Sequence, residues 1–318
     1  MKIETLSPAF KDYLWGGTRL RDDYHKPCSL PKVAESWELS THPDGQSTIS
    51  GGQFDGLTLS DYLAQNPQAL GTHCQAFENF PVLIKFIDAK QPLSIQVHPS
   101  DEYALEVEHQ YGKTEMWYVM DAEPGAFLYF GVNQELAPEE FRRRIEDNTV
   151  EQVLHKAPVH PGDVFFIPSG TIHAIGAGIL ICEIQQNSNC TYRVYDYGRL
   201  GADGKPRELH VEKALAVSRL TPSDPAEKQA APQAVPGGEI TRLASCKYFT
   251  TDRIRVDSAL TLSAGPESFL SLVVMEGSGT AAGPENTVEF RPGDSLFVPA
   301  ASGEIQVTGP CTLAVTRV

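Results

Sequence analysis

The hydrophobic residues of this chain fall mostly into short runs separated by Gly, Pro, Asn and Asp. Short apolar runs bounded by turn residues predict β-strands. Many such strands with few helices indicate a mainly β protein, built as a sandwich or a jelly-roll barrel. The predicted strands cover residues 81–87, 115–120, 164–167, 179–184, 269–275, 287–290, 295–298 and 312–315.

Helical patterns are few and short. Residues 101–111 follow Ser100, a favourable N-cap. Residues 138–155 open with Pro and two Glu and place apolar residues at helical spacing. This pattern predicts a small helical insertion at about residues 137–156. A third helix is predicted over residues 208–220.

A change in composition divides the chain. Residues 221–238 are rich in Pro, Ala and Gln and close with Gly237-Gly238, which is typical of a linker or a long surface connection. Beyond it the strand pattern resumes. We therefore predict one domain over residues 1–220, a linker over 221–240 and a second domain over 241–318.

Polar residues on three predicted strands form a candidate metal site. Alternate residues of a strand point to the same face, so Gln96 and His98 project together, as do Lys113 and Glu115. His173 follows a Gly/Pro turn. Glu115 lies in an apolar, aromatic strand, where an unpaired carboxylate is costly to bury. The set Gln96, His98, Glu115 and His173 suits a catalytic divalent metal.

An internal repeat relates the two predicted domains. Residues 160–168 (HPGDVFFIP) resemble residues 291–299 (RPGDSLFVP). Aligning the copies places Leu270 against the carboxylate of the metal set and Glu304 against its second histidine. We therefore predict two related β-barrels, the first binding a metal and the second degenerate.

Several charged residues lie at positions where burying a charge for a purely structural role would cost folding free energy. Lys85 interrupts an apolar strand, so it either lines a wet cavity, pairs with a charge or extends outward at a strand edge. Arg193 is either half of a surface ion pair with Asp196 or a phosphate-binding arginine. Together with Lys113 and Glu183, these residues would form a cationic cavity with carboxylates in reach. A phosphorylated sugar and proton-transfer chemistry require such a site.

Charge and cysteine content narrow the functional classes. The net charge of −15 over 318 residues argues against a nucleic-acid partner, because phosphate contacts need a basic surface. The six cysteines contain no Cys-x-x-Cys, which predicts thiols in a reducing compartment. The first residues lack the apolar stretch of a signal peptide, and no apolar run approaches the roughly 18–20 residues that span a bilayer. We expect a cytoplasmic protein without a membrane partner.

Several segments of the chain together resemble a known family. The pattern of residues 162–173 resembles the second motif of the cupin superfamily. A wider set of segments resembles type I mannose-6-phosphate isomerase over roughly residues 1–220, and the C-terminal part resembles the small barrel of its shorter bacterial members. These segments are 80–85 (FPVLIK), 93–99 (LSIQVHP), 112–115 (GKTE), 183–188 (EIQQNS) and 192–196 (YRVYD).

The resemblance implies an aldose–ketose isomerase that interconverts D-mannose 6-phosphate and D-fructose 6-phosphate through a cis-enediol. Its substrate partner is therefore a small sugar phosphate. The implied cofactor is one Zn²⁺ per chain, with the ligands Gln96, His98, Glu115 and His173.

The resemblance also assigns residues to the substrate. Arg193 is the implied active-site arginine, and Lys113 and Glu183 are the other predicted catalytic residues. The predicted substrate-binding residues are Ser94, Lys85 and Glu35. The identity of the base stays open among Glu183, Lys113 and Glu35.

Two other functional classes fit the same residues. A His/His/Glu set also suits an Fe(II)-dependent oxygenase built on a metal cupin. A non-catalytic sugar-phosphate sensor could use the same pocket, although a sensor needs neither a metal nor a proton-transfer set.

Overall fold

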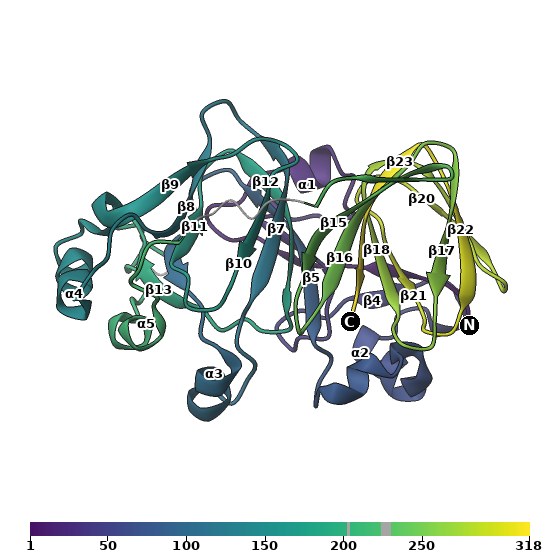
Figure 1. The fold of residues 1–318 in the computed structure, drawn as a ribbon, viewed down its shortest axis with the longest axis horizontal. Helices are drawn as coiled ribbons and strands as arrows, with labels where there is room; N and C mark the ends of the chain where they lie inside the picture. Colours follow the sequence, from purple (N-terminus) through teal and green to yellow (C-terminus); the bar gives the residue numbers. More distant parts are fainter. Residues whose placement is uncertain (202–203, 224–229) are drawn as a thin grey trace. The chain divides into compact units, whose positions relative to one another are not determined.

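The computed structural model describes residues 1–201, 204–223 and 230–318, and these residues are mainly β with a few short helices, as predicted (Figure 1). The chain divides into two compact units. The first contains Met1–Lys11, Arg19–Phe86 and Lys228–Val318, and the second contains Asp12–Thr18 and Ile87–Glu227. No helix among the described residues is both long and apolar enough to cross a membrane.

The first unit contains an eight-stranded sheet in the order β14-β15-β16-β23-β18-β21-β1-β4 and a four-stranded sheet in the order β17-β22-β19-β20. Strands β5, β3 and β2 lie next to one another in a further sheet. The N-terminal elements are β1 (Glu4–Ser7), β2 (Ala9–Lys11), α1 (Arg19–Asp22), β3 (Glu35–Leu39), β4 (Thr48–Ser50), α2 (Leu59–Gln65) and β5 (Val82–Ala89). The C-terminal strands are β14 (Gln233–Val235), β15 (Gly238–Ser245), β16 (Thr250–Val256), β17 (Ala259–Ala264), β18 (Leu270–Gly277), β19 (Gly279–Ala282), β20 (Thr287–Phe290), β21 (Ser295–Val298), β22 (Gly303–Thr308) and β23 (Cys311–Arg317).

The core of this unit follows from strand alternation. In β17, Leu260, Leu262 and Ala264 are buried while the residues between them are exposed. They join one apolar cluster with residues of β18 and β23 from the eight-stranded sheet. The two sheets therefore share a core, as in a sandwich.

The compact units differ from the predicted boundaries at residues 220 and 241. β1 pairs with β21 and with β4, so the first residues of the chain complete a sheet of C-terminal strands. Hydrogen bonding between strands far apart in sequence produces this grouping, and composition does not encode it. Within the predicted linker 221–240, residues 224–229 lie outside the described residues, and β14 and the start of β15 occupy part of the rest.

The second unit contains a five-stranded sheet in the order β13-β6-β11-β8-β9, together with the neighbouring strands β10, β7 and β12. Its strands are β6 (Ile95–Val97), β7 (Glu115–Ala122), β8 (Phe127–Val132), β9 (Leu154–Pro158), β10 (Val164–Ile167), β11 (His173–Ile175), β12 (Ile179–Gln186) and β13 (Tyr192–Tyr195). Its α-helices are α3 (Asp101–Val107), α4 (Pro138–Glu146) and α5 (Val211–Val217).

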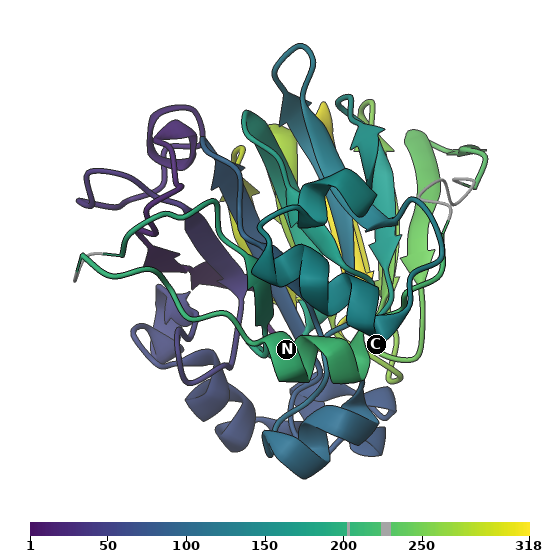
Figure 2. The same cartoon turned by 90° about the vertical axis from the view of Figure 1, so that its left-hand side faces the viewer.

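Helices α4 and α5 pack on one face of the five-stranded sheet, and Figure 2 shows them in front of its strands. Phe141 and Ile145 of α4 join an apolar cluster with Ile95 and Val97 of β6 and with Ala214 of α5. Because the helices cover this face, residues that alternate with the cluster point to the opposite face.

The predicted insertion at about 137–156 is only partly helical. α4 ends at Glu146, and Asn148 has a positive φ of 55° that the helix cannot continue through. A 3₁₀ turn (Val150–Val153) follows, and residues 154–158 form β9, which pairs with β8. The apolar spacing of residues 150–154 therefore reflects a turn and an edge strand rather than a continued helix.

The internal repeat is visible in two matching turns. Asp163 accepts a hydrogen bond from the backbone N–H of His160 (2.7 Å), and Asp294 accepts one from that of Arg291 (2.9 Å). The glycine before each aspartate has a positive φ, 93° in one copy and 94° in the other, a conformation that glycine adopts without strain. Each turn leads into a strand, β10 or β21.

The register of the repeat also matches the sequence alignment. Glu115 of β7 lies opposite Ile167, the last residue of β10, and Leu270 of β18 lies opposite Val298, the last residue of β21. The second copy therefore carries an apolar side chain at the register position of the carboxylate.

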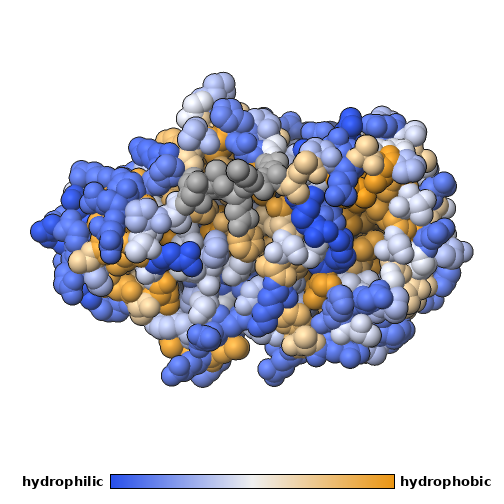
Figure 3. Space-filling view, in the orientation of Figure 1, coloured by the Kyte–Doolittle hydropathy of each residue, from blue (hydrophilic) through white to orange (hydrophobic). Residues whose placement is uncertain are grey.

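The face shown in Figure 3 is largely hydrophilic, with small apolar patches between polar side chains. The exposed large apolar side chains include Leu105 (48%) and Leu200 (59%). Scattered exposure of this kind is ordinary for a folded domain. All six cysteines lie in described residues, and none forms a disulfide.

Candidate active site

The site is built on the face of the five-stranded sheet opposite α4 and α5. Ile95 and Val97 of β6 point into the helix-covered cluster, so Gln96 between them points to the other face. Gln96 lies opposite His173 of β11 and opposite Arg193 of β13. Directly opposed residues in adjacent strands project to the same face. The sheet therefore places these three side chains in one row.

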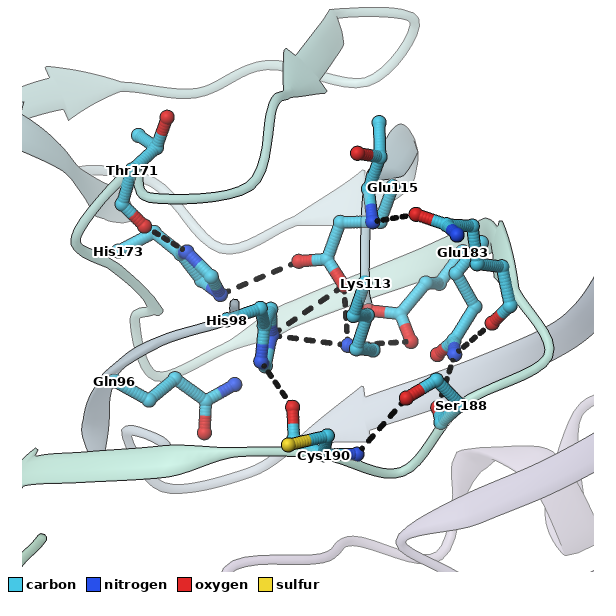
Figure 4. Close-up of polar contacts among 12 residues, drawn as sticks. Gln96, His98, Lys113, Glu115, Thr171, His173, Glu183, Ser188 and Cys190 are labelled. Carbon is cyan, nitrogen blue, oxygen red and sulfur yellow. Dashed lines mark hydrogen bonds and ion pairs between the residues drawn. The ribbon is translucent and has the colours of Figure 1, made fainter. Parts of the chain in front are cut away.

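Three predicted metal ligands converge beside this row (Figure 4). The ligand atoms of His98, Glu115 and His173 all lie within 4.8 Å of one another, and all three residues are buried. His173 Nε2 is 3.2 Å from Glu115 Oε1, and His98 Nε2 is 3.6 Å from Glu115 Oε2. Two imidazoles and a carboxylate gathered away from solvent form a set that could hold a divalent cation.

The hydrogen bonds of the two imidazoles support a role for both histidines as metal ligands. His98 Nδ1 is 2.9 Å from the carbonyl oxygen of Cys190, and His173 Nδ1 is 2.8 Å from that of Thr171. Carbonyl oxygens only accept hydrogen bonds, so each Nδ1 carries the proton and each Nε2 presents a lone pair. His173 Nε2 is buried and makes no hydrogen bond. This orientation of ligands by outer partners is typical of metal sites.

The protonation state of His173 also fits a ligand role. Burial, with the Lys113 ammonium nearby, lowers the pKa of His173 to about 4. The imidazole is therefore neutral at physiological pH, which is the form that binds a metal.

Lys113 contacts the candidate ligands directly. It donates a hydrogen bond to Glu115 Oε2, and its Nζ lies 3.1 Å from His98 Nε2 and 3.7 Å from Glu183 Oε1. Only about 5% of its side chain is exposed. The expectation that Lys113 and Glu115 share a face agrees with these contacts, and the ammonium offsets the negative charge of two buried carboxylates.

Glu183 is held by a residue that the sequence reasoning did not single out. Trp117 Nε1 donates a 2.8 Å hydrogen bond to Glu183 Oε2, and the two residues lie opposite each other in β7 and β12. The Trp117 ring also meets the His173 ring edge-on, with 5.3 Å between centroids. The spacing of Lys113, Glu115 and Trp117 by two residues could have identified it, because alternate strand residues share a face.

Of the two alternatives for Arg193, the ion pair with Asp196 is not the arrangement that the described residues show. Its Nη1 donates to the carbonyl oxygen of Glu208 (2.9 Å), and its Nε is buried without a hydrogen-bond partner. Burial lowers the pKa of Arg193, and the positive charges of Arg207 and Arg199 lower it further. A guanidinium still stays charged in this setting.

Asp196 instead binds two arginines that the sequence reasoning missed. Arg207 donates to both of its carboxylate oxygens, at 2.7 and 2.6 Å, and Arg199 also donates to Oδ1. Although burial alone raises the pKa of Asp196, these hydrogen bonds hold it below its usual value. The cluster fixes the chain directly after β13, which carries Arg193.

We expect Asp196→Asn to lower the free energy of unfolding at pH 7 by about 2 kcal/mol, because it leaves two partly buried arginines without a counter-charge. The folded-state pKa of Asp196 is lowered, so its contribution is present above the unfolded pKa of about 3.9 and is lost as the pH falls through the folded value. Urea unfolding at pH 7 and pH 3 should give a difference between wild type and variant that shrinks at the lower pH. An equal difference at both values would contradict this account.

Ser94 and Gln96 are neighbours, with Ser94 Oγ 3.5 Å from Gln96 Oε1. Ser94 is buried and Gln96 is partly exposed. Gln96 as a fourth ligand and Ser94 as a substrate contact stay predictions.

The predicted residues Glu35 and Lys85 lie in the first unit and pair with each other. Lys85 Nζ is 3.5 Å from Glu35 Oε2 and 4.6 Å from the centroid of the Trp37 ring. Trp37 Nε1 donates to Glu35 Oε2 at 2.7 Å. Of the alternatives considered for Lys85, pairing with a charge is the one observed. The roles of Glu35 and Lys85 in binding substrate stay predictions.

Comparison with known proteins gives two family matches. Residues 3–125 match the family model described as phosphomannose isomerase type I, catalytic domain. Residues 239–318 match the one described as mannose-6-phosphate isomerase, cupin domain.

Individual relatives match along almost the whole chain. The mannose-6-phosphate isomerase ManA of Bacillus subtilis is 38% identical over 304 residues, which cover 95% of this chain and 94% of that protein. The mannose-6-phosphate isomerase of Streptococcus mutans is 37% identical over 286 residues, covering 90% and 89%. The crystal structure of the mannose 6-phosphate isomerase from Bacillus subtilis superposes with a TM-score of 0.93 at 34% identity and covers 100% of both chains. The chain therefore belongs to the type I mannose-6-phosphate isomerase family.

Proposed function

We propose that this chain is an aldose–ketose isomerase that interconverts D-mannose 6-phosphate and D-fructose 6-phosphate with one Zn²⁺ per chain. The observation that carries the proposal is the buried cluster of His98, Glu115 and His173 in a chain of this family. The substrate class rests on the relatives, which are mannose-6-phosphate isomerases matched over nearly their full length. The cytoplasmic location stays a prediction from the sequence.

The cluster would hold the metal through two imidazole nitrogens and a carboxylate, and Gln96 would add an amide oxygen. Zinc accepts such mixed N/O sets, and a catalytic zinc keeps one position open. When bound, the metal would act as a Lewis acid that stabilises negative charge developing on the substrate oxygens.

The chain's own residues would move the protons. The aldose-to-ketose direction takes a proton from C2, delivers one to C1 through a cis-enediol, and shifts a hydroxyl proton from O2 to O1. Glu183 and Lys113 are the candidates from the second unit, since Trp117 holds one oxygen of Glu183 and Lys113 lies 3.7 Å from the other. Glu35 is the candidate from the first unit. A base for this step works best with a pKa near the working pH.

Arg193 would stabilise the charge that develops on the enediol, because a fixed cation in a partly buried position needs no reorganisation during the reaction. Ser94, Lys85 and Glu35 are proposed as substrate-binding residues. The ammonium of Lys85 suits an anionic sugar phosphate.

The test is a coupled assay of mannose 6-phosphate isomerisation on chelated protein, before and after Zn²⁺ is added. We expect turnover to disappear on chelation and to return with about one equivalent of zinc, as one such cluster among the described residues predicts. Measuring bound metal in the same samples links activity to occupancy.

Failure would take distinct forms. Turnover that survives complete removal of metal would contradict the proposed cofactor. Bound metal without isomerisation would contradict the proposed reaction, and oxygen consumption with iron would then indicate an oxygenase. Tight binding of mannose 6-phosphate without turnover would indicate a sensor.

A further inference from the structure

The end of β12 and the loop that follows it form a segment whose polar side chains the proposed chemistry does not use. Gln185, Gln186 and Ser188 are all buried, and the sequence segment that contains them was noted only as part of a resemblance. Buried polar groups of this kind are retained where their hydrogen bonds fix a geometry. Their partners connect this loop to the candidate metal ligands.

Ser188 connects to His98 through the backbone of one residue, Cys190. Its Oγ accepts a 3.1 Å hydrogen bond from the backbone N–H of Cys190 and donates a 2.8 Å hydrogen bond to the carbonyl oxygen of Tyr111. The carbonyl oxygen of Cys190 in turn lies 2.9 Å from His98 Nδ1. The hydroxyl therefore fixes the residue whose carbonyl oxygen accepts the His98 proton (Figure 4).

Gln186, the last residue of β12, connects this region to the segment that carries Lys113 and Glu115. Its Oε1 accepts from the backbone N–H of Thr114 at 2.9 Å, and its Nε2 donates to Asp101 Oδ1 at 2.7 Å. Gln185 closes the loop by donating to the carbonyl oxygens of Gln186 and Ser188, each at 2.7 Å. The loop thus contacts the two segments that supply His98 and Glu115.

We infer that Ser188 is a positioning residue for the metal: its hydroxyl holds the backbone N–H of Cys190, and the carbonyl oxygen of the same residue then keeps the Nε2 lone pair of His98 directed at the metal position. This inference rests on the proposed zinc site and adds a determinant of metal affinity. Outer partners of a ligating histidine typically change metal affinity by about 10–100-fold. Ser188 acts through one intervening residue, Cys190, so the lower end of that range applies.

The test compares zinc dissociation constants of wild type, Ser188→Ala and Ser271→Ala, measured on metal-free protein by competition with a chromophoric chelator. Ser271 is a matched control, because it is as fully buried as Ser188 but its Oγ makes no hydrogen bond. We expect Ser188→Ala to weaken zinc binding about tenfold and Ser271→Ala to leave it unchanged. At saturating zinc, Ser188→Ala should regain most of its kcat, which a damaged fold would not allow.

A wild-type affinity in Ser188→Ala would overturn this inference and leave the proposed function intact. Absence of zinc binding by the wild-type protein would overturn the proposed cofactor and this inference with it. If Ser188→Ala does not fold, Ser188→Cys decides, because it preserves the volume but replaces the hydroxyl with a weak hydrogen-bonding thiol. Unchanged zinc affinity in folded Ser188→Cys would then overturn the inference.

Discussion

Replacing His98 with alanine should remove bound metal and turnover together. Its Nε2 is one of three buried ligand atoms within 4.8 Å of one another, and its Nδ1 is already committed to a carbonyl oxygen. Loss of a ligand should weaken zinc binding by more than the roughly 100-fold seen when an outer partner is lost. The measurements are metal per chain after gel filtration and turnover in the coupled assay.

His160→Ala is the matched control, since the His160 side chain is 77% exposed and lies in the same unit. It should retain both metal and activity. Full metal occupancy in His98→Ala would show that His98 is not a ligand. Loss of metal in both variants would instead point to a general loss of structure.

Replacing Arg193 with alanine should lower kcat by about 10²–10³-fold, the usual effect of removing a group that stabilises transition-state charge. The guanidinium lies on the strand next to Gln96, in the same row as His173. Among the described residues, its side chain makes a single hydrogen bond, to the Glu208 carbonyl, so the fold should survive its removal. Turnover at saturating zinc and thermal unfolding followed by circular dichroism together separate the two effects.

Arg143→Ala provides the comparison, because Arg143 is an exposed arginine of α4 paired only with Glu140 in its own helix. Its kcat should equal that of wild type. Near-normal turnover in Arg193→Ala would remove Arg193 from the mechanism. A rise in KM without a change in kcat would limit its role to substrate binding.

The strands were the most predictable part of the fold. β10, β20 and β21 have the predicted bounds, because Gly, Pro, Asn or Asp lies at or near the ends of each short strand. Those local signals also identified the repeat, and its register is now visible in the pairing of β7 with β10 and of β18 with β21. Local sequence determines where such strands begin and end.

The grouping of strands was less predictable. Pairing of β1 with β21 joins residues nearly the whole chain apart, and no local pattern indicates that partner. The helix predicted to reach residue 155 was wrong beyond Glu146. The left-handed backbone of Asn148 ends the helix, and apolar residues that follow at helical spacing belong to a 3₁₀ turn and to the edge strand β9. Pairing between distant segments overrides local spacing in both cases.

Part of the candidate site could likewise be predicted from the sequence, and part could not. Strand alternation predicted that Gln96 would face the site, and the structure gathers His98, Glu115 and His173. The groups that orient the histidines are backbone carbonyls of Thr171 and Cys190, and a backbone carbonyl has no signature in the sequence. Arg199 and Arg207 were missed because Asp196 was considered only as an alternative ion-pair partner of Arg193.

The repeat also bears on how the protein would acquire the proposed metal. Leu270 takes the register position of Glu115 in a copy that keeps the same turn and the same strand neighbours, so this architecture stands on a hydrophobic interior alone. In the proposed zinc enzyme, folding and metallation would therefore be separable, unlike in zinc fingers, whose binding energy is their folding energy. Newly made chains would fold first and bind zinc afterwards, and their activity in the cell would follow the available zinc rather than the rate of synthesis.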